Sequence, residues 1–418
     1  MTKMHSKIDP EFVGAHFPAL NKDWVFCDNA GGSQIVKGAV DKISEFLLEK
    51  NVQIGGSYAV SQAAAAALME GRKAAQTLVN AARPEEIVFG PSTTALMQTL
   101  AGAMRSQLSP GDEIIVTLAD HESNIGPWDR LREFGIVIKF WPFDHETYDL
   151  RLEDLEPLMT DRTRLVCVTH VSNILGHINP IAEFARFIHE KGARICVDAV
   201  AYAPHRAIDV QAWDVDYYVF SLYKCYGPHT AIMYGKYDLL GELDGMYHYF
   251  YGKDKVPGKL EPGNPNYELA YSTVGVVDYL VALGESVGGG GSRRDRICAA
   301  YDAITVQEDA LTGRLLDWLN ARNDCRVIGK TTNDGSARVP TIAFKFDGQN
   351  SGEVARKMDD YGIAIRFGDF HARRLVENLD EAGDDGVIRV SMVHYNTLEQ
   401  VDRLCGALGE IVGSNAAA

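Results

Sequence analysis

One lysine stands where an amine could capture a carbonyl group. Lys224 follows the apolar run Tyr217–Phe220 and precedes Gly227 and Pro228. The aromatic neighbours desolvate the ammonium group, which penalises its charged form and lowers the pKa of the lysine. A neutral amine at this place can form an imine, and the alternative interpretation is a surface lysine that extends its charge into solvent.

An aspartate is expected to face this lysine. Asp198 ends the strand-like run Arg194–Val197, 26 positions before Lys224. In an open α/β sheet the carboxyl ends of the strands face the ligand crevice, so the two side chains can converge there. A buried carboxylate would keep a pyridinium nitrogen protonated, so that the ring draws electrons from a carbanion at an amino acid's Cα. The alternative is an aspartate that caps the next helix.

Two further segments follow predicted strands. Gly90–Ala95 contains a serine and two threonines and precedes the helix-like run Leu96–Met104. Hydroxyl groups and free backbone N–H groups at a helix N-terminus suit a phosphate, although serine and threonine are also ordinary N-caps. His121 follows the next strand. Its flat ring could stack on an aromatic cofactor, and the alternative is a structural histidine.

Short apolar runs alternate with helix-like segments between about residue 85 and residue 235. Several runs are apolar throughout, as strands covered on both faces tend to be. This pattern predicts an α/β fold with a mostly parallel, seven-stranded sheet wrapped by helices. The expected strands are Glu86–Phe89, Glu113–Thr117, Val137–Trp141, Leu165–Thr169, Arg194–Val197, Tyr217–Phe220 and Ala231–Tyr234.

The glycine run Gly288–Gly291 predicts an exposed loop or hinge between two domains. We expect a large domain over residues 31–287 and a smaller α+β domain over residues 288–418, which the N-terminal segment 1–30 would join. The smaller domain has expected strands at Val339–Phe346, Ile363–Arg366 and Val387–Val393, and expected helices around Gly352–Tyr361 and Leu398–Val412.

Composition narrows the classes of partner and compartment. The 57 acidic and 41 basic residues leave a formal net charge of -16, which would repel nucleic acid and anionic membranes, so neither is an expected partner. The seven cysteines are odd in number and include no C-x-x-C pair, which favours a reducing compartment. Since no apolar run is long enough to cross a bilayer, we expect a cytoplasmic protein.

Together these motifs resemble the class V aminotransferase superfamily of fold-type I pyridoxal phosphate (PLP) enzymes, and within it the cysteine desulfurase-like branch. The resemblance covers nearly the whole chain. It also includes Asp28-Asn-Ala, Asn173-Ile-Leu-Gly, Glu261-Pro-Gly-Asn-Pro-Asn266 and Arg389-Val-Ser-Met-Val-His-Tyr-Asn396. The resemblance implies PLP as the cofactor, an amino acid as the substrate, and a homodimer in which the partner subunit completes the active site.

The resemblance also implies a role for each matching position. Lys224 would be the Schiff-base lysine, Asp198 the partner of the pyridinium nitrogen and His121 the ring that stacks on the pyridine. The phosphate would bind Thr93, Thr94 and Ser221, with Asn264 contributed across the dimer, and Asn173 would lie beside the phenolic oxygen. Arg389 would bind the α-carboxylate of the substrate, and the other expected substrate-binding residues are Ala30, Tyr223 and His371.

The chain departs from the desulfurase pattern at three positions. The mobile cysteine that takes up sulfur is matched by His371, and no cysteine lies within thirty residues of it. A glutamine near the phenolic oxygen is replaced by Ala201, and the histidine before the Schiff-base lysine by Tyr223. Tyr223 and His205 could take over hydrogen bonds near the imine, and a structural role is the alternative for each.

Loss of the cysteine makes chemistry at the substrate's β-carbon the leading hypothesis. We expect a lyase or a carbon–carbon bond-forming enzyme, working by β-elimination or by β-decarboxylation through an enamine. His371 with Arg366, Arg373 and Arg374 would then recognise or protonate the β-substituent. The alternatives are a class V aminotransferase or an epimerase, then a cysteine desulfurase, then a non-catalytic scaffold, which the presence of both Lys224 and Asp198 disfavours.

Overall fold

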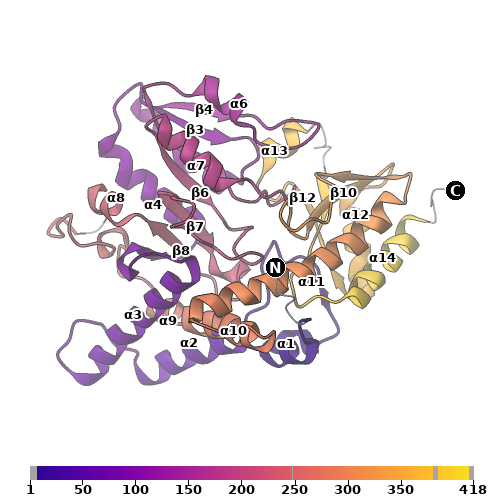
Figure 1. Cartoon of the computed structure of the whole chain (residues 1–418), viewed down its shortest axis with the longest axis horizontal. Coiled ribbons are helices and arrows are strands. Elements are labelled where there is room, and N and C mark those ends of the chain that lie inside the picture. The colour runs from indigo at the N-terminus through magenta and orange to yellow at the C-terminus, as the bar shows by residue number, and fades with distance from the viewer. Residues whose placement is uncertain (1–6, 247, 380–384, 414–418) are drawn as a thin grey trace.

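A seven-stranded sheet forms the centre of the larger part of the molecule (Figure 1). The computed structural model describes residues 7–246, 248–379 and 385–413. The strand order is β2-β8-β7-β6-β5-β3-β4, and only β8 runs antiparallel to its neighbours, which confirms the mostly parallel sheet. The strands are β2 (Ile87–Gly90), β3 (Glu113–Thr117), β4 (Val137–Trp141), β5 (Thr163–Thr169), β6 (Arg194–Asp198), β7 (Tyr217–Ser221) and β8 (Ala231–Gly235).

The apolar strands bury both of their faces. In β5, Val166 and Val168 belong to one core, whereas Leu165 and Cys167 belong to the core on the opposite face. Alternate side chains point to opposite faces of a sheet, so a strand covered on both sides has to be apolar throughout. One face packs against α3 (Ala59–Val79), α7 (Ile181–Glu190) and α10 (Thr273–Ser286), and the other against α4 (Thr93–Met104), α5 (Gly126–Asp129) and α8 (Tyr237–Glu242).

A smaller sheet of four antiparallel strands follows in the C-terminal part, in the order β12-β13-β10-β9. Its strands are β9 (Cys325–Ile328), β10 (Thr341–Phe346), β12 (Arg366–Gly368) and β13 (Val387–Ser391), and α12 (Ser351–Lys357) and α14 (Leu398–Val412) pack with them. Helix α13 (Arg373–Asn378) instead buries Leu375 and Val376 in the core beside the large sheet. The predicted α+β character is therefore confirmed. The sequence analysis did not predict β9, because it is short and mostly half-exposed and carries no apolar alternation.

The N-terminal segment contacts both parts. Strand β1 (Val25–Phe26) pairs in parallel with β11 (Ile363–Ala364) of the C-terminal part. Helix α1 (Pro10–His16) instead contributes Val13 to the core beside the large sheet. The boundaries at residues 30 and 287 therefore stay a prediction. The remaining helices are α2 (Lys37–Glu49), α6 (Leu152–Leu155) and α9 (Tyr267–Tyr271).

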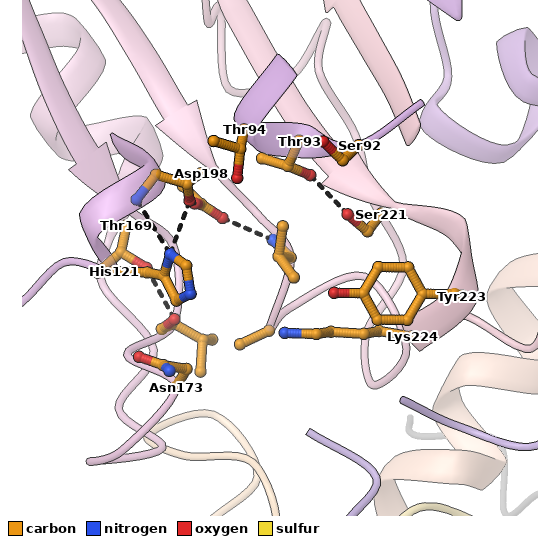
Figure 2. A pocket seen from close by; sticks show the side chains of 14 residues that line it. Ser92, Thr93, Thr94, His121, Thr169, Asn173, Asp198, Ser221, Tyr223 and Lys224 are labelled. Carbon is orange, nitrogen blue, oxygen red and sulfur yellow. Dashed lines mark hydrogen bonds between the residues drawn. The ribbon is translucent and has the colours of Figure 1, made fainter. Parts of the chain in front are cut away.

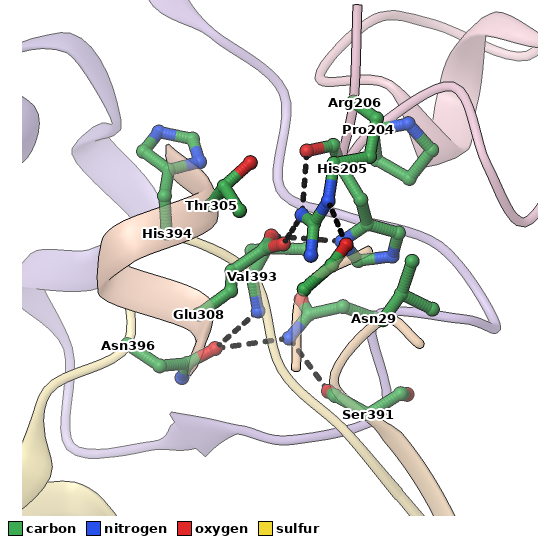
Figure 3. A network of polar contacts seen from close by, with 12 residues as sticks. Asn29, Pro204, His205, Arg206, Thr305, Glu308, Ser391, Val393, His394 and Asn396 are labelled. Carbon is green, nitrogen blue, oxygen red and sulfur yellow. Dashed lines mark hydrogen bonds and ion pairs between the residues drawn. The ribbon is translucent and has the colours of Figure 1, made fainter. Parts of the chain in front are cut away.

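One long helix, α11 (Arg293–Asn320), joins the two cores. Its first half, including Ile297, packs in the core beside the large sheet, and its second half, including Leu315, packs in the core of the smaller sheet. Between them, the fully buried Glu308 accepts hydrogen bonds from His205 Nδ1 (2.8 Å) and Arg206 Nη1 (2.6 Å), as Figure 3 shows. The loop that follows β6 is therefore tied to α11.

None of the helices in the described ranges combines the length and apolar character that a membrane crossing requires.

Candidate active site

One cavity lies where the carboxyl ends of β5, β6 and β7 meet the N-terminus of α4 (Figure 2). The empty space between its walls, including the part that opens to solvent, measures about 460 Å³. Most of the predicted cofactor-binding residues line it. The lining residues are Ser92, Thr93, Thr94, His121, Ser123, Thr169, Val171, Asn173, Asp198, Val200, Ala201, Ser221, Tyr223 and Lys224.

Lys224 presents a buried amine to this cavity. It ends a short helical turn after β7 and its side chain is only 8% exposed. Burial, helped by the positive charge of Arg389, lowers the pKa of Lys224 to about 8. Its Nζ lies 5.8 Å from the centre of the Tyr223 ring and makes no hydrogen bond to any described residue. The neighbouring Cys225 thiol points to the Ala203 carbonyl instead (3.4 Å), in agreement with a packing role.

Asp198 ends β6 and is also buried. The Val200 N–H donates to Oδ1 at 3.0 Å, and the Ser123 hydroxyl oxygen lies at a longer 3.4 Å from Oδ2. Burial raises the pKa of the Asp198 carboxyl, although the Val200 N–H and the Lys224 charge oppose the shift. The second oxygen therefore has room for a stronger, positively charged donor.

His121 is held in one tautomer by Ser123. Its Nδ1 accepts a hydrogen bond from the Ser123 backbone N–H (3.0 Å) and lies 2.8 Å from the Ser123 hydroxyl. Burial, with a contribution from the charge of Lys224, lowers the pKa of His121 to about 3. The ring is therefore neutral, and its proton is on Nε2. Ser123 thus connects His121 to Asp198, a link that the sequence analysis missed although Ser123 stands two residues after His121.

Hydroxyl groups gather at the other end of the cavity. The hydroxyls of Thr93 and Ser221 lie 2.7 Å apart, and Ser92 caps α4 by accepting from the Ala95 N–H (3.1 Å). Thr94 lines the cavity beside them. Asn264 lines a different cavity, between β2, α4 and the 260–266 segment, so within one chain it is not part of this cluster.

Arg389, on β13, lies next to the cavity and is 2% exposed. Its Nη1 donates to the Asn173 carbonyl (3.1 Å), its Nη2 pairs with Asp28 (3.0 Å), and its guanidinium lies 3.8 Å from the centre of the Phe370 ring. The Asn173 amide group donates to the Phe370 carbonyl (3.0 Å), and its place beside a phenolic oxygen stays a prediction. Phe370 stands in no motif that would have identified it from the sequence.

The loop that carries His371 closes one side of the site. The His371 ring lies 5.5 Å from that of His121, and its carbonyl accepts from the Glu122 N–H (2.8 Å). Phe370 and His371 both have left-handed backbone conformations, with φ of 51° and 57°, which non-glycine residues rarely adopt. Ala30 lies nearby, and its N–H donates to the Ser391 hydroxyl (2.8 Å).

Three predicted roles change in the structure. Arg374 pairs with Glu122 (3.0 Å) and Arg373 with Glu377 (2.7 Å), so neither guanidinium is directed at the cavity. His205 lies outside the cavity, because its imidazole binds the buried Glu308 of α11 (Figure 3). Of the basic residues expected at the β-substituent, His371 and Arg366 remain near the site.

Comparison with known proteins agrees with this geometry. The Aminotransferase class-V profile matches residues 25–404. The aminotransferase-like protein FGM3 of Gibberella zeae is 41% identical over 96% of this chain and 98% of that protein, and the cysteine desulfurase-like protein ustD of Aspergillus flavus is 35% identical over 98% and 92%. The apo structure of a cysteine desulfurase from Thermococcus onnurineus superposes with a TM-score of 0.86 at 26% identity, covering 98% of this chain and 99% of that one. The chain belongs to the class V aminotransferase family of PLP-dependent enzymes and is cysteine desulfurase-like.

Proposed function

We propose that this protein binds PLP through Lys224 and acts at the β-carbon of an amino acid, as a lyase or a carbon–carbon bond-forming enzyme. The observation that carries the proposal is a cavity in which a buried amine of lowered pKa faces a buried carboxylate, while no cysteine stands among the described residues that line it.

The residues present fit PLP. The Asp198 oxygen that Ser123 holds at only 3.4 Å can accept from a protonated ring nitrogen, and the paired hydroxyls of Thr93 and Ser221 at the α4 N-terminus suit a phosphate. The flat, neutral His121 ring lies on the Asp198 side of the cavity (Figure 2). Bound there, PLP would supply an electron-withdrawing ring that weakens the bonds at the amino acid's Cα and activates a group on Cβ.

The chain's own residues would hold and transfer protons and bind the substrate. Asp198 would hold the proton on the ring nitrogen, and the Lys224 amine, once released by the substrate, would carry a proton to and from Cα. Arg389 would bind the α-carboxylate through its guanidinium. Because the pKa of His121 is about 3, its ring would pack on the cofactor as a neutral group and add no positive charge.

A second pocket supports chemistry at Cβ. It shares Thr94, His121 and Ser123 with the main cavity, and His371 forms part of its wall. A group that leaves or joins the substrate at Cβ would have space there. The position that a desulfurase gives to its cysteine is occupied by an exposed imidazole, which can exchange a proton but cannot take up sulfur from the substrate.

We also propose a cytoplasmic homodimer. Large apolar side chains are exposed on or just before α2 and α3, among them Leu48 at 85% and Tyr58 at 54%, and such surfaces mark protein interfaces. Asn264 would then be offered to the cofactor of the partner. The odd number of cysteines and the lack of a C-x-x-C pair support a reducing compartment.

The experiment is an assay of the PLP-loaded protein against the common amino acids and cysteine sulfinate, with and without an added carbonyl electrophile. We expect one substrate to lose its β-substituent, with Lys224→Ala as the inactive control. Accumulation of the pyridoxamine form would instead indicate an aminotransferase. Formation of alanine and enzyme-bound sulfur from cysteine would contradict the proposal.

A further inference from the structure

Arg389 already has an internal carboxylate partner. Asp28 Oδ1 lies 3.0 Å from Arg389 Nη2, and Asp28 Oδ2 lies 2.9 Å from Arg366 Nη2. The two arginines differ in environment, because the Arg389 side chain is 2% exposed and that of Arg366 is 56% exposed. Asp28 therefore bridges a buried cation in the site and a solvated cation at its rim.

The Asp28 bridge uses only one of the two adjacent guanidinium nitrogens with which Arg389 could bind a carboxylate. Arg389 Nε is buried and has no acceptor among the described residues. A carboxylate that binds an arginine with two parallel hydrogen bonds would use Nε together with Nη2. Since Asp28 already occupies Nη2, an incoming carboxylate would lie directly beside the Asp28 carboxylate, and the two negative charges would repel each other.

Asp28 has little freedom to turn away from this fork. Its backbone bridges to Ser391 of β13, and the Gly31 N–H donates to its carbonyl (2.9 Å). A Cβ on Gly31 would come within 2.7 Å of Asp28 Oδ2, so the chain approaches the carboxylate closely on that side. When Arg389 turns to another carboxylate, Arg366 is the ion-pair partner that still offsets the Asp28 charge.

We propose that Asp28 is a placeholder for the substrate's α-carboxylate: it competes for Arg389 in the free enzyme, and Arg366 retains it when a substrate binds. Asp28 and Arg366 are thus positioning residues that set the affinity for the α-carboxylate by acting on Arg389. This inference rests on the proposed function, because it assumes that an amino acid binds at Arg389.

Titration of the PLP-loaded enzyme with glycine, followed by the absorbance of the bound coenzyme, tests the proposal. Methylamine is the matched probe, because it has the amine of glycine and lacks the carboxylate. We expect Asp28→Asn to lower the Kd for glycine about tenfold, since it removes the competing charge, and to leave the Kd for methylamine unchanged. A rise in the glycine Kd of Asp28→Asn would show that Asp28 only supports the fold, and would overturn the proposal.

A second variant can test the proposal if Asp28→Asn folds poorly. Arg366→Gln changes an exposed side chain and should raise the glycine Kd about threefold, because Asp28 then holds Arg389 more firmly. In the Asp28→Asn background the same change should have no effect. An equal effect in both backgrounds would mean that Arg366 attracts the substrate directly and would overturn the proposal. Arg373→Gln, on the neighbouring exposed helix, is the control for loss of one positive charge.

The two proposals fail differently. If glycine does not change the coenzyme spectrum of the unaltered enzyme, the amino-acid function is contradicted, and this inference falls with it. If glycine binds the unaltered enzyme and the glycine Kd of the variants does not change as expected, only the inference about Asp28 is overturned.

Discussion

The hydroxyls of Thr93 and Ser221 lie 2.7 Å apart although 128 residues separate them in the chain. Thr93 begins α4 and Ser221 ends β7, so the contact joins a helix N-terminus to the edge of the sheet that also presents Asp198. This pair marks the end of the cavity where we place the phosphate of PLP.

Thr93→Val should weaken the binding of PLP but not that of pyridoxal. The substitution keeps the shape of the side chain and removes one hydroxyl that would bond a charged phosphate, which corresponds to a loss of about 10- to 100-fold in affinity. The measurement is the Kd of each compound for the apoenzyme. Thr99→Val, farther along α4 and outside this cavity, is the control. Equal losses for both compounds would place Thr93 away from the phosphate.

The rate at which the apoenzyme captures pyridoxal should rise with pH, with a midpoint at about pH 8. Burial lowers the pKa of the Lys224 amine to about 8, and only the neutral amine attacks a carbonyl. Asp198 raises the pKa of Lys224, so Asp198→Asn should move the midpoint to lower pH. Stopped-flow absorbance gives the rate, and Lys224→Ala gives the background. A midpoint near 10.5, the ordinary value for lysine, would contradict the burial argument.

His121→Phe should keep PLP affinity within about threefold, whereas His121→Ala should lose about tenfold, because ring stacking contributes about 0.5–1.5 kcal/mol beyond the area it buries. Since burial lowers the pKa of His121 to about 3, the pH profile of kcat should contain no ionisation of this ring, and the phenylalanine variant should keep the profile of the unaltered enzyme. Loss of an inflection near pH 6.5 in His121→Phe would show that the imidazole titrates.

Glu308→Ala should destabilise the protein by about 3–5 kcal/mol, because it removes the closer carboxylate partner of the buried Arg206 at 2.6 Å and leaves only the longer contact with Asp309 at 3.7 Å. Urea unfolding followed by circular dichroism measures the change. Asp317→Ala, exposed on the same helix, should change the free energy of unfolding by no more than about 0.5 kcal/mol. Similar values for the two variants would mean that the Glu308 pair does not join α11 to the loop after β6.

Most of the fold could be predicted from the sequence, because each central strand can be recognised from its own residues. Strands such as β3 and β5 are buried on both faces, so each is an uninterrupted apolar run that can be found without knowledge of its neighbours. Lys224, Asp198 and Thr93 could be predicted for a related reason: each stands near the end or start of such an element, where the topology of a parallel sheet brings them together. Ser221 could be expected only from the family resemblance.

The tertiary structure decided the contacts between distant segments. Asp28 pairs with Arg389, which lies 361 positions later in the chain, and the Asn173 amide donates to the Phe370 carbonyl, 197 positions later. No local sequence pattern predicts either contact. The same holds for His205. Its position close to Asp198 in the chain suggested a place in the active site, but its imidazole forms a structural ion pair with Glu308. Sequence alone determined which elements form and which residues stand at their ends, because those properties depend on neighbours along the chain. Only packing decided which charges meet, because partners are chosen by proximity in space.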